Sequence, residues 1–72
     1  MENKKLKELG KKITIHRVKK DLTQTDLSVK SGLAYSTISL IENGKSVPRL
    51  SSLYKIANIL EIDPDELTQY LD

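Results

Sequence analysis

The chain has 72 residues and a mass of 8.1 kDa; 38% of its residues are hydrophobic and 31% are charged, so residues 1–72 are expected to form one small globular domain. The absence of cysteine excludes disulfides, thiolate zinc sites and thiol nucleophiles, and the lack of a long apolar run argues against a membrane span, which together predict a soluble cytoplasmic protein. The net charge of +2 is unevenly distributed along the chain. Residues 1–50 contain eleven Lys and Arg and five Asp and Glu, whereas residues 51–72 contain one Lys and five Asp and Glu. The basic part favours a polyanionic partner, although lysines that only keep the protein soluble would give the same distribution.

The first helix is predicted over residues 4–19. Leu6, Leu9, Ile13 and Val18 recur at nearly helical spacing and form its expected buried side. Six lysines surround this side: Lys4, Lys5, Lys7, Lys11, Lys12 and Lys19. The apolar residues of the helix are few and are needed for the core, so no contact with a membrane is expected.

The second and third helices are short and close together in the sequence. Thr23 is a natural N-cap for the second helix, and Asp26 completes a weaker form of the capping box. Gly32 is expected to end this helix after about two turns. The third helix is predicted over about residues 35–43, with Gly44 as its left-handed stop.

The remainder of the chain contains a loop and two further helices. Residues 45–49 are predicted to form a loop, because Pro48 cannot lie inside a helix. The fourth helix has a continuous apolar stripe: Leu50, Leu53, Ile56, Ala57 and Leu60. Asp63 is expected to cap the fifth helix, with Pro64 in its first position and Glu66 completing a capping box. Because no segment alternates as a strand does, the predicted fold is all-α with five helices.

The second and third helices together have the spacing of a helix-turn-helix, over about residues 23–43. The small Ser28 lets the two helices cross closely, and Gly32 permits a sharp turn between them. Ile38 and Ile41 attach the third helix to the core. A helix held crosswise on a basic domain is suited to filling a major groove.

The residues around this motif strengthen the interpretation. The pattern consists of Leu22-Thr23-Gln24, Leu27, Gly32, Ile38-Ser39, Ile41-Glu42-Asn43-Gly44, Pro48, Leu53, Ile56-Ala57 and Leu60. It resembles the phage-repressor and Cro-like helix-turn-helix family, also called the xenobiotic-response-element (XRE) type, from about Leu9 to Leu67. The resemblance implies a compact five-helix domain that binds operator DNA as a symmetric dimer and regulates transcription, here as a repressor, with residues 35–43 in the major groove of a half-site.

The resemblance also implies a set of DNA contacts. The positions expected to reach base edges are Tyr35, Ser36, Ser39 and Leu40. The positions expected to contact phosphates are Gln24, Thr37, Asn43, Lys45 and Arg49, although each is also compatible with an ordinary surface role. A structural salt bridge between Arg17 and Glu42 is expected to tie the first helix to the end of the third. Because the third helix has no Arg, Lys or Gln before Asn43, it offers no strong bidentate reader of guanine or adenine, and shape readout is expected to contribute.

Three residues depart from the family pattern. Asp21 stands where many relatives have glycine, and Ala34 stands where a hydroxyl residue commonly caps the third helix, which is expected to cost about 1 kcal/mol. His16 stands where many relatives have leucine, and it is interpreted as a half-buried side chain because no second metal ligand accompanies it. No metal, cofactor or small-molecule ligand domain is expected.

Other functions were weighed against DNA binding. An enzyme is not expected, because the single histidine has no nucleophilic partner at a recognisable spacing and no glycine-rich phosphate loop occurs. The alternative is a protein-interaction module on the same fold, an antitoxin or an anti-regulator, and the weak base-reading inventory of the third helix supports it. The retained phosphate-side residues favour DNA binding and a protein associated with the nucleoid.

A homodimer is expected through the C-terminal part of the chain. Five apolar side chains there exceed what one small core is expected to absorb: Ile59, Ile62, Leu67, Tyr70 and Leu71. The alternative is that several of them simply close the core. In a two-fold dimer, two half-sites would lie about 34 Å apart, one turn of DNA.

Overall fold

The computed structural model describes residues 3–71, so Asp72, counted above with the acidic segment, lies outside the described residues. These residues form five α-helices and a final 3₁₀ turn: α1 (Lys4–Lys19), α2 (Gln24–Ser31), α3 (Tyr35–Glu42), α4 (Leu50–Leu60), α5 (Asp65–Thr68) and η1 (Gln69–Leu71). No strand occurs among them. The predicted all-α, five-helix fold is therefore confirmed, with extents of 30 × 23 × 21 Å.

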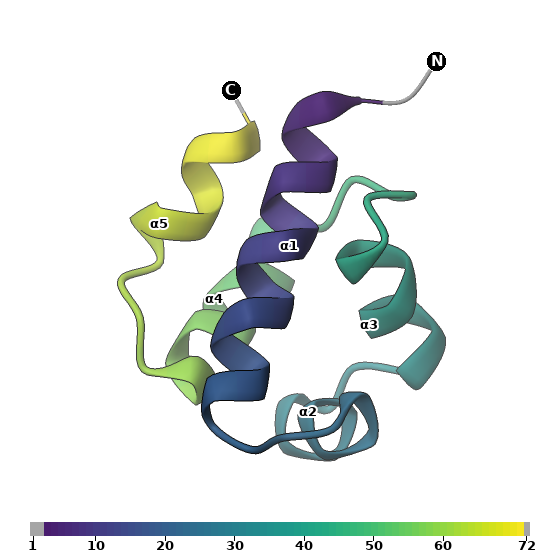
Figure 1. The fold of residues 1–72 in the computed structure, drawn as a ribbon, viewed down its shortest axis with the longest axis vertical. Helices are drawn as coiled ribbons and strands as arrows, with labels where there is room; N and C mark the ends of the chain where they lie inside the picture. Colours follow the sequence, from purple (N-terminus) through teal and green to yellow (C-terminus); the bar gives the residue numbers. More distant parts are fainter. Residues whose placement is uncertain (1–2, 72) are drawn as a thin grey trace.

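The long helix α1 is the axis around which the other helices are arranged. In Figure 1, α3 lies on one side of α1 and α5 on the other, while α4 passes behind it. Helix α2 lies across the end of the molecule where α1 finishes, and it packs on both α3 and α4. This arrangement leaves the outer side of α3 uncovered.

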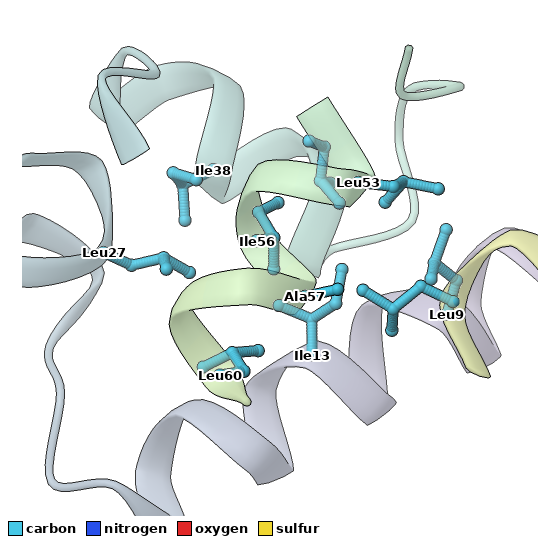
Figure 2. Close-up of a cluster of buried hydrophobic side chains, with 10 residues drawn as sticks. Leu9, Ile13, Leu27, Ile38, Leu53, Ile56, Ala57 and Leu60 are labelled. Carbon is cyan, nitrogen blue, oxygen red and sulfur yellow. The ribbon is translucent and has the colours of Figure 1, made fainter. Parts of the chain in front are cut away.

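The core is built from the predicted apolar stripes except at Val18 and Leu50, which are 57% and 54% exposed because each lies near an end of its helix. Figure 2 shows labelled side chains of α1, α2 and α3 lying against those of α4. The buried cluster consists of Leu9, Ile13, Leu27, Ile38, Ile41, Leu53, Ile56, Ala57, Leu60 and Leu67. Burying one such side chain contributes about 1.5–3 kcal/mol for the larger residues, so this cluster is what holds α3 in position.

The ends of α2 and α3 match the predicted stop and start signals. Thr23 Oγ1 accepts a hydrogen bond from the Asp26 N–H at 3.0 Å, and Asp26 Oδ2 accepts one from the Thr23 N–H at 2.9 Å, so the capping box is confirmed. Gly32 and Gly44 follow α2 and α3 with φ angles of 75° and 67°, in the left-handed region that favours glycine. Ala34 makes no side-chain cap at the start of α3.

The fifth helix begins one residue later than predicted, at Asp65, with Pro64 as its N-cap residue and no side-chain cap hydrogen bond. Asp63 Oδ1 accepts a hydrogen bond from the Asp65 N–H at 2.9 Å, and Pro64 has helical backbone angles. The predicted capping box with Glu66 is wrong. The Glu66 carboxylate lies 3.3 Å from the Lys12 ammonium of α1 and forms an ion pair with it, because α5 packs along that side of α1.

Candidate nucleic-acid interface

The turn between α2 and α3 is held by side-chain hydrogen bonds. Ser28 Oγ donates to the Leu33 carbonyl oxygen at 2.5 Å, and the Leu33 N–H donates to Ser31 Oγ at 3.1 Å. Leu27 of α2 and Ile38 of α3 are both fully buried on the core side of the turn. The two helices are thus fixed relative to each other, in the arrangement that a helix-turn-helix requires.

The outer face of α3 carries the four predicted base-contacting residues. Tyr35 is 53% exposed and Leu40 is 45% exposed, while Ser36 is exposed and Ser39 is half-buried. Ser36, Ser39 and Leu40 lie three and four positions apart and therefore share one face of the helix. With Asn43, the first residue after α3, they form what we call the recognition face: Ser36, Ser39, Leu40 and Asn43.

The predicted phosphate-contacting residues lie around this face in three places. Gln24, the first residue of α2, lines a groove with Tyr35. Thr37 lines another groove with Arg49, which immediately precedes α4. Lys45 lies in the connection between α3 and α4, and both Lys45 and Arg49 are exposed.

Two of these polar side chains are already hydrogen bonded within the protein. Asn43 Nδ2 donates to the Ser39 carbonyl oxygen at 2.9 Å, which closes the end of α3. Gln24 Nε2 donates to Glu42 Oε1 at 3.1 Å, which joins the start of α2 to the end of α3. Asn43 Nδ2 also donates to Ser39 Oγ at 3.4 Å. Gln24 Nε2 has a second N–H, which is left for another acceptor.

The predicted salt bridge between Arg17 and Glu42 is present. Arg17 Nε donates to Glu42 Oε2 at 2.8 Å and Arg17 Nη2 donates to Glu42 Oε1 at 3.1 Å, in the two-pronged geometry that suits a carboxylate. Arg17 Nη1 also donates to the Leu22 carbonyl oxygen at 2.7 Å. Only 4% of the Glu42 side chain and 13% of the Arg17 side chain is exposed.

The electrostatics of Glu42 are set by its donors. Burial alone would raise the pKa of Glu42, but hydrogen bonds from Arg17, Gln24 and Thr14 outweigh it and lower that pKa below its ordinary value. Thr14 Oγ1 lies 2.8 Å from Glu42 Oε1. The carboxylate is therefore ionised and neutralised within the protein, and it does not oppose the approach of a polyanion to α3.

Sequence reasoning missed Thr14 and Gln24 as partners of Glu42, and it missed the role of Gly10. A Cβ at position 10 would overlap the carbonyl oxygen of Glu42, so α1 meets the last turn of α3 through its main chain. Gly10 and Thr14 are four residues apart and face α3 together. The available signal was two small residues, one turn apart, on an otherwise lysine-rich helix.

The five C-terminal apolar residues pack on the core to different extents. Leu67 is fully buried, and the other four pack against the core with their side chains partly buried: Ile59, Ile62, Tyr70 and Leu71. The exposed apolar side chains in this half of the molecule are Leu50 and Tyr54 of α4, at 54% and 51%, and the neighbouring Val47 at 71%. Leu71 lines one groove with Leu50 and Val47.

His16 is half-buried, as expected, and within residues 3–71 no group of three or more potential ligands is placed to hold a metal ion. None of the described helices is long and apolar enough to cross a membrane.

Known proteins support the helix-turn-helix assignment. Residues 13–67 match the helix-turn-helix family. The chain is 36% identical over 61 residues to an uncharacterised HTH-type transcriptional regulator of Methanocaldococcus jannaschii, covering 85% of this chain and 92% of that protein. It is 32% identical over 59 residues to the uncharacterised HTH-type transcriptional regulator YozG of Bacillus subtilis, covering 81% and 70% of the two chains.

A phage protein is similar as well. The ImmF control region 10 kDa protein of Bacillus phage phi105 is 35% identical over 57 residues, covering 79% of this chain and 63% of the phage protein. The matched region contains α2, the turn and α3, and therefore the whole recognition face. This chain belongs to the phage-repressor and Cro-like (XRE-type) helix-turn-helix family of DNA-binding transcriptional regulators, which are not enzymes.

Proposed function

We propose that this chain is a sequence-specific repressor that acts as one DNA-binding domain over residues 1–72 and places α3 in the major groove of an operator half-site. The observation that carries the proposal is the recognition face, which is uncovered and uncharged, together with the exposed cations Lys45 and Arg49 in the connection that follows α3. An α-helix fits the major groove, and cations at its edges meet the phosphates.

Base reading falls to the four outward residues of α3. The hydroxyls of Ser36 and Ser39 donate or accept hydrogen bonds, and Leu40 and Tyr35 offer apolar contact to thymine methyl groups. None of them forms a strong bidentate pair with a purine. Specificity therefore rests in part on the shape and deformability of the operator, which a rigid helix and fixed phosphate contacts can read.

The phosphate contacts frame α3. Gln24 lies at the start of α2, where the free amides of the first turn and the positive end of the helix dipole attract an anion. Its bond to Glu42 fixes the direction of its amide before DNA arrives. On the other side of α3, Thr37 and Arg49 border one groove, while Asn43 and Lys45 follow the end of the helix.

The active form that we propose is a homodimer associated with the nucleoid in the cytoplasm. Its contact surface combines the C-terminal Leu71 with the exposed Val47, Leu50 and Tyr54. Leu50 lines one groove with Leu71 and Val47, and Tyr54 is one turn further along α4. Changing Leu50 to Asp is expected to convert the dimer to a monomer in sedimentation velocity runs at high micromolar concentration; a wild-type monomer under those conditions contradicts the dimer.

Repression follows from occupancy, because a dimer covering a promoter excludes polymerase. The phage relative, named as a protein of a control region, is in keeping with such a role. A second candidate function is a protein-interaction module on the same fold. It is favoured by one observation, namely that α3 presents no arginine, lysine or glutamine on its outer face.

The deciding experiment is fluorescence anisotropy of a short random-sequence duplex at about 50 and 200 mM salt. Five or six phosphate contacts predict a loss of affinity of roughly a thousandfold across that range, because counterions are released on binding. The double change of Lys45 and Arg49 to Gln is expected to flatten this dependence. The matched control changes Lys12 and Lys20 to Gln, since these lysines pair with Glu66 and Glu61. No binding at low salt would favour the protein-interaction module.

A further inference from the structure

Three residues on one side of α1 face the last turn of α3. Gly10, Thr14 and Arg17 follow one another at spacings of four and three positions, so they share a face of the helix. A Cβ at position 10 would overlap the carbonyl oxygen of Glu42, because the two helices approach closely there. The short side chain of Thr14 therefore reaches α3, and Thr14 Oγ1 lies 2.8 Å from Glu42 Oε1.

Glu42 Oε1 is an acceptor that connects α1, α2 and α3. From α1 it accepts hydrogen bonds from Thr14 Oγ1 at 2.8 Å and from Arg17 Nη2 at 3.1 Å. From α2 it accepts one from Gln24 Nε2 at 3.1 Å. An ionised carboxylate has no proton to donate, so the amide of Gln24 turns its nitrogen toward Glu42 and not its oxygen. The carboxylate therefore sets the orientation of the Gln24 amide.

Gln24 is the most movable of these donors. Arg17 is fixed by its further bonds to Glu42 Oε2 at 2.8 Å and to the Leu22 carbonyl oxygen at 2.7 Å. Gln24 is half-buried and lines a surface groove with Tyr35. Its Nε2 carries a second N–H, and a side-chain amide binds a phosphate through such a donor. A change in the other donors of Glu42 Oε1 therefore acts first on Gln24.

Thr14 completes the set of donors on this oxygen. Its hydroxyl has a single proton and lies 2.9 Å from the Gly10 carbonyl oxygen and 2.8 Å from Glu42 Oε1, of which the charged oxygen is the stronger acceptor. Only 4% of the Glu42 side chain is exposed, so the carboxylate depends on protein donors and has little access to water. Loss of the hydroxyl would leave Oε1 short of one donor in a buried position, which is unfavourable.

We propose that Thr14 is a positioning residue for DNA-phosphate binding: it satisfies Glu42 Oε1 from α1 and thereby keeps the second N–H of Gln24 available at the surface. Without the hydroxyl, Gln24 moves toward the vacated side of Oε1, and its amide is drawn away from the phosphate. The inference rests on the proposed function, because it requires Gln24 to contact DNA. Thr14 acts through Gln24 and makes no DNA contact of its own.

The test is a double-mutant cycle on Thr14 and Gln24, in which fluorescence anisotropy measures affinity for a short random-sequence duplex at about 50 mM salt. Thr14→Val removes the hydroxyl and keeps the shape of the side chain, and Thr14→Ser, the matched control, keeps the hydroxyl. Gln24→Ala is expected to weaken binding about tenfold and Thr14→Val about threefold. Thr14→Ser is expected to match wild type, and Thr14→Val is expected to cause no further loss in the Gln24→Ala background.

Two further readouts distinguish positioning from a general loss of stability. Circular dichroism melts verify that each variant is folded at the temperature of the titration. The side-chain NH₂ resonances of Gln24 in NMR spectra of the free protein report on the position of the amide. They are expected to shift in Thr14→Val and to stay close to their wild-type positions in Thr14→Ser. Unshifted resonances in Thr14→Val would contradict the positioning role.

The outcomes separate the inference from the proposed function. If Thr14→Val binds as wild type does while Gln24→Ala is weakened, the inference is overturned and the function stands. An equal loss from Thr14→Val in the wild-type and Gln24→Ala backgrounds also overturns the inference, because Thr14 would then act without Gln24. Unchanged affinity of Gln24→Ala overturns it as well. A wild-type protein that does not bind the duplex at low salt overturns both.

Discussion

The outer side of α3 and the C-terminal segment both carry apolar residues that the sequence makes conspicuous, and the structure treats them in opposite ways. Leu40 and Tyr35 of α3 remain about half exposed, whereas Leu67 of α5 is fully buried. Two of the three are leucines, so hydrophobicity does not distinguish their roles. The exposed Leu40 and Tyr35, on an otherwise polar face, are available for contact with a partner. The buried Leu67, beneath a short helix, closes the core.

The largest expected effect tests the buried side of the comparison. Changing Leu67 to Ala removes a side chain with no exposed surface and leaves a cavity, which is expected to destabilise the domain by about 2–5 kcal/mol. In a chain of 72 residues this is a large share of the total stability. Urea denaturation measures the change, and a loss below roughly 0.5 kcal/mol, the level of surface substitutions, would contradict the packing of α5.

The next largest effect concerns the salt bridge between Arg17 of α1 and Glu42 of α3. Changing Glu42 to Gln leaves the guanidinium of Arg17 largely buried without its counter-charge, at an expected cost of about 1–3 kcal/mol. Replacing Arg17 with Met in the same chain is expected to recover part of that loss. A double-mutant cycle in urea measures the coupling, and additive single effects would contradict it.

The pH dependence of stability has the same origin. The pKa of Glu42 is lowered in the folded state, so its ionised form stabilises the fold above the pKa of the unfolded chain. That contribution is lost as the pH falls through the folded-state value. We expect the wild type to lose more stability than E42Q on acidification below about pH 4.3, the ordinary pKa of glutamate, as measured by thermal melts along a pH series.

A smaller effect of opposite sign is expected at the start of α3. Ala34 occupies the N-cap position without a side-chain hydrogen bond, so Ser at this position is expected to raise stability by about 1 kcal/mol. Because the change lies immediately before α3, it also tests whether the start of α3 is already fixed. Unchanged affinity for random DNA is expected, and a higher melting temperature measures the cap.

The smallest effect on stability is expected at Leu40, on the exposed side of the comparison. Changing Leu40 to Ala is expected to alter stability by less than about 0.5 kcal/mol, as surface substitutions do. Its affinity for an operator obtained by selection is expected to fall about fivefold, with random-duplex affinity unchanged, because only base reading is affected. Fluorescence anisotropy with the two duplexes measures the difference. Equal losses of affinity on both would mean that Leu40 contributes to binding irrespective of DNA sequence.

Much of the fold could be predicted because its signals are local. The capping box of Thr23 and Asp26, the stops at Gly32 and Gly44 and the stripe of α4 each follow from short-range spacing. The positive φ of Glu61, which ends α4, was not predictable in this way, because a glutamate rarely adopts it; its carboxylate pairs with Lys20, far away in the chain.

The site could be predicted in part. The outward position of Ser36 and Leu40 follows from helical periodicity once Ile38 and Ile41 are assigned to the core. The bond between Gln24 and Glu42 and the main-chain contact of Gly10 with Glu42 depend on how α1, α2 and α3 meet in space. No pattern within a single helix carries that information. The DNA contacts themselves stay predictions.

The main-chain contact at Gly10 has a consequence for how this domain can diversify. Because no side chain separates α1 from the last turn of α3, the tilt of α3 against α1 is determined at this point by main-chain atoms. Residues 36, 39 and 40 can then be exchanged without altering that tilt. In a library randomised at these three positions, with Gly10 retained, α3 would keep one tilt against α1. The members would differ only in the side chains that α3 presents.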